Sequence, residues 1–260
     1  MHFHFNFSAI EILWTLQFAA MLVLLVVLQG RDRVRRFPWF TASMVIVALD
    51  MLVSHILYRR MPMVVSETIF LAMADLTAIV SLLIVVEIAR RAFKDAERAL
   101  WLSGTAALLM VGAAVLVLWG PWPSYKTLFA ASGMVALRLM QLFAQKANLL
   151  GDVLTVQLGL LVVIVGRYFH SGWRTHVQRV VIGLATVSLS QLVVSGVQQY
   201  IASHATIHSS AEYQHVMDVM TYWRNGNQVV FIVALVWWIA CLWIDEPGTE
   251  GREPATGNRE

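Results

Sequence analysis

Seven long apolar runs, separated by shorter polar segments, dominate the pattern along this chain. Each run is close to the roughly 20 residues that a helix, rising about 1.5 Å per residue, needs to cross a hydrocarbon core about 30 Å thick. The runs lie at residues 9–29, 38–58, 64–89, 99–119, 150–169, 179–201 and 227–244. The pattern therefore predicts an all-α fold, a bundle of seven transmembrane helices.

Basic residues are distributed unevenly between the connections of this predicted bundle. Thirteen of the 19 follow the first, third and fifth runs or lie in the C-terminal tail, whereas six lie in the other connections. Lys and Arg collect on the cytoplasmic side of membrane proteins, which predicts an outside N-terminus and a cytoplasmic C-terminus. The first run is not expected to be a cleaved signal peptide, because residues 1–8 contain no Lys or Arg and four arginines follow it.

Two segments fall outside the seven runs. Residues 124–148 are apolar enough to suggest an eighth span, but Arg138 would then lie near the middle of the membrane. We expect this stretch to form a helix that lies in, or rises through, the outer interface. Residues 245–260 are rich in Gly, Pro and charge, so the transmembrane domain 1–244 is expected to end in a disordered cytoplasmic tail.

Composition supports a membrane location and narrows the chemistry. The 260 residues are 58% hydrophobic and 13% charged, which leaves little material for a soluble domain. The single cysteine, Cys241, lies inside the last run, so a disulfide framework and a paired-cysteine metal site are excluded. We expect a multi-pass protein of a bacterial inner (plasma) membrane.

Polar side chains gather in the outer half of the predicted spans. A charged side chain at this depth costs about 2.5–3.5 kcal/mol on insertion scales, so these groups should face the interior of the bundle. Asp50 and Asp75 lie near the midplane, where low dielectric and mutual repulsion would favour a bound proton or cation. The full set comprises Gln17, Asp50, Ser54, His55, Glu67, Asp75, Asp152, Gln157, Gln191, Ser195 and Gln198.

Two interpretations of this polar set remain open. In the first, the side chains line an outward-facing, water-accessible cavity with Asp50 and Asp75 at its floor. In the second, each carboxyl group is protonated and simply hydrogen-bonds to a neighbouring helix, contributing under about 1 kcal/mol to packing.

The connection 202–226 is rich in histidine and acidic residues at near-helical spacing. On a continuous helix these residues would share one face about 120° wide, which suits Zn²⁺ or a similar metal. A capping box from Ser209 to Glu212 would instead start the helix near residue 210 and leave the first two histidines in a loop. The alternative is a solvated, His-rich connection. The candidate ligands are His204, His208, Glu212, His215 and Asp218.

Several membrane-protein classes lack their required residues here. The last run contains no lysine for a retinal Schiff base, and His55 alone lies clearly within a span, which disfavours bis-histidine haem. No HExxH, phosphate-binding loop or nucleophile elbow occurs, so no catalytic residue is assigned and the chain is not expected to be an enzyme.

One stretch carries a family resemblance. Residues Leu160 to His176, which end in RYFHSGWRTH, resemble uncharacterised seven-helix integral membrane proteins of acidobacterial type. The resemblance covers one helix and the loop after it, and it implies no activity.

The sequence is therefore compatible with three functions. The first is a sensing or binding module, or accessory subunit, whose outward cavity takes a small ligand, a proton or a cation. The second is a carrier coupled to protons or cations, and the third is a metal-dependent membrane enzyme that uses the outer histidines. Besides the bilayer, the arginine-rich loops could contact anionic lipid or a protein partner, and nucleic acid is not expected. The ligand and the oligomeric state are not predicted.

Overall fold

The computed structural model describes residues 9–57, 62–92, 98–119, 122, 135–168, 176–204 and 209–244. Within these ranges the chain forms seven helices and no strands, which confirms the all-α prediction. The helices are α1 (Ala9–Gly30), α2 (Pro38–Leu57), α3 (Met63–Ala92), α4 (Arg98–Leu118), α6 (Val135–Tyr168), α7 (His176–His204) and α8 (Ser210–Trp243). The predicted tail 245–260 lies outside the described residues.

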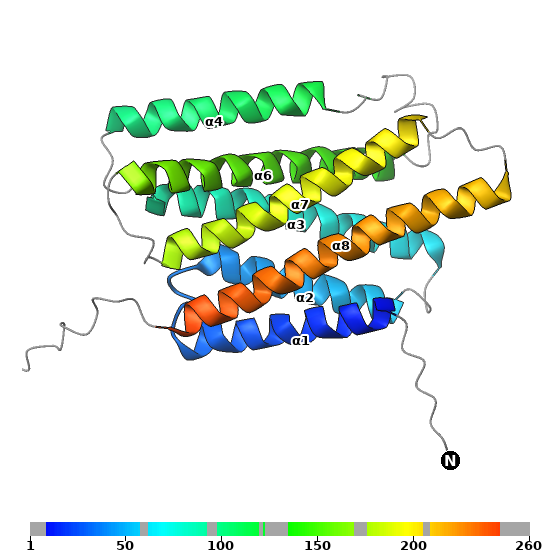
Figure 1. Cartoon of the computed structure of the whole chain (residues 1–260), viewed down its shortest axis with the longest axis horizontal. Coiled ribbons are helices and arrows are strands. Elements are labelled where there is room, and N and C mark those ends of the chain that lie inside the picture. The colour runs from blue at the N-terminus through cyan, green and yellow to red at the C-terminus, as the bar shows by residue number, and fades with distance from the viewer. Residues whose placement is uncertain are drawn as a thin grey trace, which may run out of the picture.

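All described helices except α4 are long and apolar enough to cross a bilayer. The described apolar part of α4, Leu109–Leu118, is shorter. By the length and composition of these six helices, the chain is a multi-pass membrane protein. Figure 1 shows the helices running roughly side by side along the long axis of the molecule.

Two helices extend well beyond the apolar runs from which they were predicted. Residues 135–148 are not a separate interfacial helix but the first part of α6, while residues 124–134 lie outside the described ranges. Likewise, residues 210–226 belong to α8, which begins at Ser210 as the Ser209–Glu212 capping box predicts. In both cases polar residues precede the apolar run and mark its limit. The helix nevertheless includes these residues, because they favour helical structure and contain no proline.

Contacts between helix ends define two ends of the bundle. The Arg31 guanidinium lies 5.4 Å from the centre of the Trp243 ring, and Trp39 N donates to a Glu87 carboxylate oxygen over 3.1 Å. The ends of α1, α3 and α8 therefore meet the start of α2. We call this end, marked by the loop 31–36 and by Arg90, the arginine end, and the opposite end, marked by Trp14 and Tyr213, the far end.

Six helices form a closed ring, and α4 lies outside it. Neighbouring pairs in the ring are α1–α2, α2–α3, α3–α6, α6–α7, α7–α8 and α8–α1, with an additional contact from α3 to α7 across it. In the described residues α4 packs against one helix, α6. In Figure 1, α4 accordingly occupies one edge of the molecule and α1 the other.

Side chains of α6 fix α4 in place. The Lys146 ammonium donates to the carbonyl of Trp119 over 2.7 Å and lies 4.5 Å from the centre of the Trp122 ring. It thereby satisfies a carbonyl at the end of α4 that the helix itself leaves without a donor. Further along, the missing side chain of Gly112 makes room for Leu150 and Leu154.

The buried apolar core occupies only one half of the ring. All six ring helices contribute to it, and every helical member lies at the midpoint of its helix or nearer the arginine end. Trp238 is fully buried at the centre, with its ring 5.1 Å from that of Phe40 in an edge-on arrangement. We call this half the apolar half; its largest members are Met21, Leu24, Leu28, Phe37, Phe40, Leu158, Leu235, Trp238 and Leu242.

Candidate functional site

The far half of the ring, which we call the polar half, is packed less tightly. In the described far halves of α1, α2, α3 and α8, no side chain is buried apart from that of Ala48, which lies at the midpoint of α2. Figure 1 shows one reason, since α8 lies against α1 at the arginine end and diverges from it toward the far end. This half carries most of the polar residues that the sequence singled out.

These polar residues continue the buried stripes of their helices. Gln17 lies four residues before the fully buried Met21, and Asp75 lies three before the fully buried Ala78. Asp50 follows the buried Ser43 by seven residues. Residues three, four or seven apart share a helix face, so these side chains are on the packed faces of α1, α2 and α3.

The two carboxyl groups lie at the same level of the bundle. Helices α2 and α3 are antiparallel, and the Trp39–Glu87 hydrogen bond fixes their register. Asp50 is 11 residues beyond Trp39 and Asp75 is 12 residues before Glu87, so each lies about 17–18 Å from that bond along its helix. Both side chains are half-buried.

The ring pairings bring α8 to this level with two residues that the sequence analysis missed. Asn227 Nδ2 donates to Gln191 Oε1 of α7 over 2.6 Å. Asn227 and Gln228 lie seven residues before the buried Ala234 and Leu235, so they continue both buried stripes of α8. The contact of Arg31 with Trp243 fixes the register of α1 and α8. Measured along the helices from that contact, Asn227 and Gln228 lie within about one helical turn of the level of Gln17.

Among the buried acceptor oxygens that receive no hydrogen bond from the described part of the chain are Asp75 Oδ1, Gln157 Oε1, Asn227 Oδ1 and Gln228 Oε1. A buried acceptor without a donor costs about 1–3 kcal/mol, so such oxygens in native proteins usually face a donor or a cation. Gln157 stands apart from the other three, because it lies beside the fully buried Leu158 in the apolar half.

Helices α6 and α7 are also joined by a polar contact. The Ser188 hydroxyl, which is buried, donates to the carboxylate of Asp152. The Thr155 hydroxyl, also buried, donates to the carbonyl of Gly151 in its own helix over 2.7 Å. Asp152 is therefore joined to α7, as the packing interpretation of the polar set expects.

The remaining predicted residues of the polar set lie nearer the surface. Glu67 is exposed, while Ser195 and Gln198 on α7 are half-buried. His55 is exposed and stacks on Trp14 of α1, with ring centres 4.5 Å apart. Ser54 is half-buried one turn beyond Asp50.

The predicted metal ligands are divided between two helices and a segment outside the described residues. His204 is the last residue of α7, where its ring stacks on Tyr200 with centres 4.4 Å apart. Ser209 caps α8 as expected, because its hydroxyl accepts from Glu212 N over 3.2 Å. Glu212, His215 and Asp218 are exposed on the first turns of α8.

Among the described residues, no group of three or more His, Cys, Asp or Glu side chains is placed to hold a metal ion. His208 lies outside these residues. The zinc site therefore stays a prediction.

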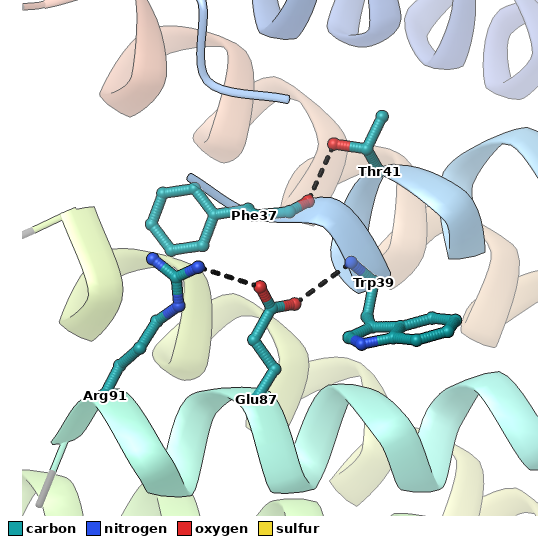
Figure 2. Close-up of polar contacts among 5 residues, drawn as sticks. All are labelled: Phe37, Trp39, Thr41, Glu87 and Arg91. Carbon is teal, nitrogen blue, oxygen red and sulfur yellow. Dashed lines mark hydrogen bonds and ion pairs between the residues drawn. The ribbon is translucent and has the colours of Figure 1, made fainter. Parts of the chain in front are cut away.

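At the arginine end, Glu87 forms a polar site that the sequence analysis did not assign. Its side chain is 6% exposed and accepts from Arg91 Nη2 over 3.1 Å as well as from Trp39 N. Figure 2 shows the carboxylate between the guanidinium and the first turn of α2, with the Phe37 ring beside it. Because Phe37 has no polar side chain and precedes Pro38, α3 supplies the acceptor that caps α2.

Comparison of the chain with known protein families, curated proteins and solved structures finds no match.

Proposed function

We propose that this protein spans the membrane seven times and binds a proton, a cation or a small protonated ligand in its polar half. In this proposal α4 is the seventh span, and the arginine end faces the cytoplasm, as expected from the positive charge. The polar half then opens to the exoplasmic side. Binding would be reported to a partner or to the lipid at the arginine end.

One observation carries the proposal, the division of the ring into an apolar and a polar half. The unpaired groups of the polar half are all acceptors, and the carboxyl groups of Asp50 and Asp75 lie near the level of the side-chain amide groups of Asn227 and Gln228. Acceptors without donors select a ligand that brings positive charge or N–H groups. The apolar half would keep water and ions from passing further.

Thermal unfolding of the purified protein in detergent tests this function. Sodium, potassium, ammonium and methylammonium chlorides are added at constant ionic strength, with choline chloride as the balance. A cation that binds only the folded protein should raise the unfolding temperature as its concentration exceeds its dissociation constant. A second series varies pH alone and detects proton binding.

Asp75→Asn and Asp50→Asn should abolish the cation or proton dependence, because each keeps the shape of the side chain and removes its charge. Asp32→Asn is the matched control: Asp32 is exposed at the arginine end with φ 51°, a conformation that Asn also adopts readily. If wild type responds to no cation and to no pH change, or if both variants keep the response, the proposal is wrong.

A carrier is the second candidate, and the order of the helices favours it. Helices α1–α3 and α6–α8 each form a row of three, and the rows join through α1–α8 and α3–α6. Two such groups in the same orientation, linked by one extra helix, form the parallel repeat that some transporters use. A carrier in sealed vesicles would couple a pH gradient to uptake of the bound cation, whereas a binding module would give binding without flux.

A further inference from the structure

The loop between α1 and α2 is a folded structure and presents several arginines in a fixed arrangement. Arg33 N donates to Leu28 O over 2.9 Å, and Phe37 N donates to Arg33 O over 2.8 Å. Asp32 adopts a left-handed φ of 51°, which reverses the chain directly after α1. Backbone hydrogen bonds therefore close the turns of this short connection.

Positive charge dominates the surface of this loop and of the neighbouring helix ends. Arg31 lies over Trp243, and Arg36 lies 5.9 Å from the centre of the Phe37 ring. The Arg35 side chain is 89% exposed, and its ion pair with Asp32 is long, at 4.0 Å. An exposed pair of this kind has little strength. The nearby Glu87 carboxylate does not offset the charge at the surface, because it is buried against Arg91 and α2.

Exposed aromatic rings stand beside these guanidinium groups. Trp39 is 43% exposed at the start of α2, and Trp243 is 57% exposed at the end of α8. Tryptophan rings collect at the level of lipid headgroups, where one edge is apolar and the other is wet. Tryptophan rings at that level would hold the arginines of the loop at the depth of the lipid phosphates.

We infer that the arginine end binds the phosphate of an anionic phospholipid, held by Arg31, Arg35 and Arg36 and flanked by Trp39 and Trp243. A guanidinium group matches a phosphate with two parallel N–H donors and is weakly hydrated, so it loses little on entering the interface. The exposed tryptophans favour a lipid over a soluble acidic partner, since a soluble partner would leave these rings in water. This site is independent of the ligand proposed for the polar half.

Native mass spectrometry of the protein from mixed micelles tests the lipid site. The micelles contain phosphatidylglycerol and phosphatidylcholine in equal amounts, and the ratio of the two lipids retained by the protein is measured. Each basic side chain near an anionic surface strengthens binding about fivefold. Arg35→Gln combined with Arg36→Gln should therefore reduce the preference for phosphatidylglycerol about twenty-five-fold.

The control removes the same charge from the other end of the molecule. Arg138 and Arg224 are exposed on α6 and α8 toward the far end, and the pair Arg138→Gln with Arg224→Gln should leave the preference unchanged. If the first pair does not fold, Arg35→Gln alone should still lower the preference about fivefold, because that side chain is largely in solvent.

Two results would overturn the inference. The first is an equal loss of preference in the variants at both ends, which would mean that only the total charge matters. The second is binding of inorganic phosphate or an acidic peptide as tightly as the lipid, because the lipid assignment requires the acyl chains to contribute.

Discussion

At the scale of single residues, Glu87 shows how a carboxylate is accommodated inside an apolar bundle. Its two oxygens are used by different partners, Arg91 on its own helix and the N–H groups that begin α2. The partial positive charge at a helix N-terminus stabilises such a carboxylate, and the Arg91 ion pair adds to this. The Arg91 guanidinium also lies 5.2 Å from the centre of the Phe37 ring, which links the loop to α3.

Glu87→Gln should lower the free energy of unfolding by about 2 kcal/mol, because it weakens hydrogen bonds to a charged group and leaves Arg91 without its carboxylate. Unfolding in detergent micelles, followed by tryptophan fluorescence, measures the change. The double variant with Arg91→Gln should lose less than the sum of the single losses, since the two residues interact. A Glu87→Gln protein within about 0.5 kcal/mol of wild type would contradict the capping role.

The sequence contained part of this residue-level information. The insertion cost of polar side chains predicted that Gln17, Asp50 and Asp75 face the bundle interior, and all three are half-buried on faces that continue into buried stripes. Asn227 escaped notice because its partner, Gln191, is 36 residues away, and no local pattern records which helices are neighbours. The capping role of Glu87 was partly indicated by the sequence. The start of α2 has no capping side chain of its own, so an acceptor from another helix was to be expected.

At the scale of elements, hydropathy located every helix but not the true lengths of α6 and α8. Both have 34 residues, well beyond the length of a bilayer crossing. A hydropathy window ends where polar residues begin, whereas a helix ends where capping or backbone restrictions stop it. The Ser209 cap gave the start of α8 correctly for this reason.

Close packing between α7 and α8 depends on Gly183. A side-chain carbon added there would lie 2.6 Å from Trp238 Cε2, and the same indole donates to Val180 O over 3.3 Å. Gly183→Ala should therefore destabilise the protein by about 1–3 kcal/mol, as overpacking does. Thermal unfolding in detergent measures this loss.

Gly226→Ala is the matched control, because Gly226 lies within α8 and a carbon added there meets nothing within 4 Å. It should be neutral or stabilising by up to about 1 kcal/mol. Equal effects of the two alanines would show that helix propensity alone, and not the Trp238 contact, decides the stability.

At the scale of the whole molecule, the closed ring with α4 outside it could not be read from the sequence. Apolar faces say that a helix packs, but they do not say against which neighbour, because lipid and protein surfaces are equally apolar. The alternation of direction along the chain was predictable, since consecutive helices joined by short loops must reverse. The structure adds the pairing of α1 with α8, which closes the ring.

Sidedness can be measured with single cysteines in a Cys241→Ala background. Arg35→Cys and Tyr222→Cys replace exposed residues toward opposite ends of the bundle and should react with a membrane-impermeant maleimide from opposite sides of sealed vesicles. Trp122→Cys, just beyond α4, should react from the same side as Tyr222→Cys if α4 is a span. Reaction of Trp122→Cys from the side of Arg35→Cys would leave six spans.

The length of α8 has a mechanical consequence. The Trp238 ring packs against Gly183 and, eleven residues earlier, Asn227 donates to Gln191, which leaves 17 residues of α8 from Ser210 to that hydrogen bond. At about 1.5 Å per residue this arm is about 26 Å long, so a small tilt of α8 about its packed part moves Ser210 much farther than Trp243. A small adjustment at one membrane face would thus be magnified into a swing at the other.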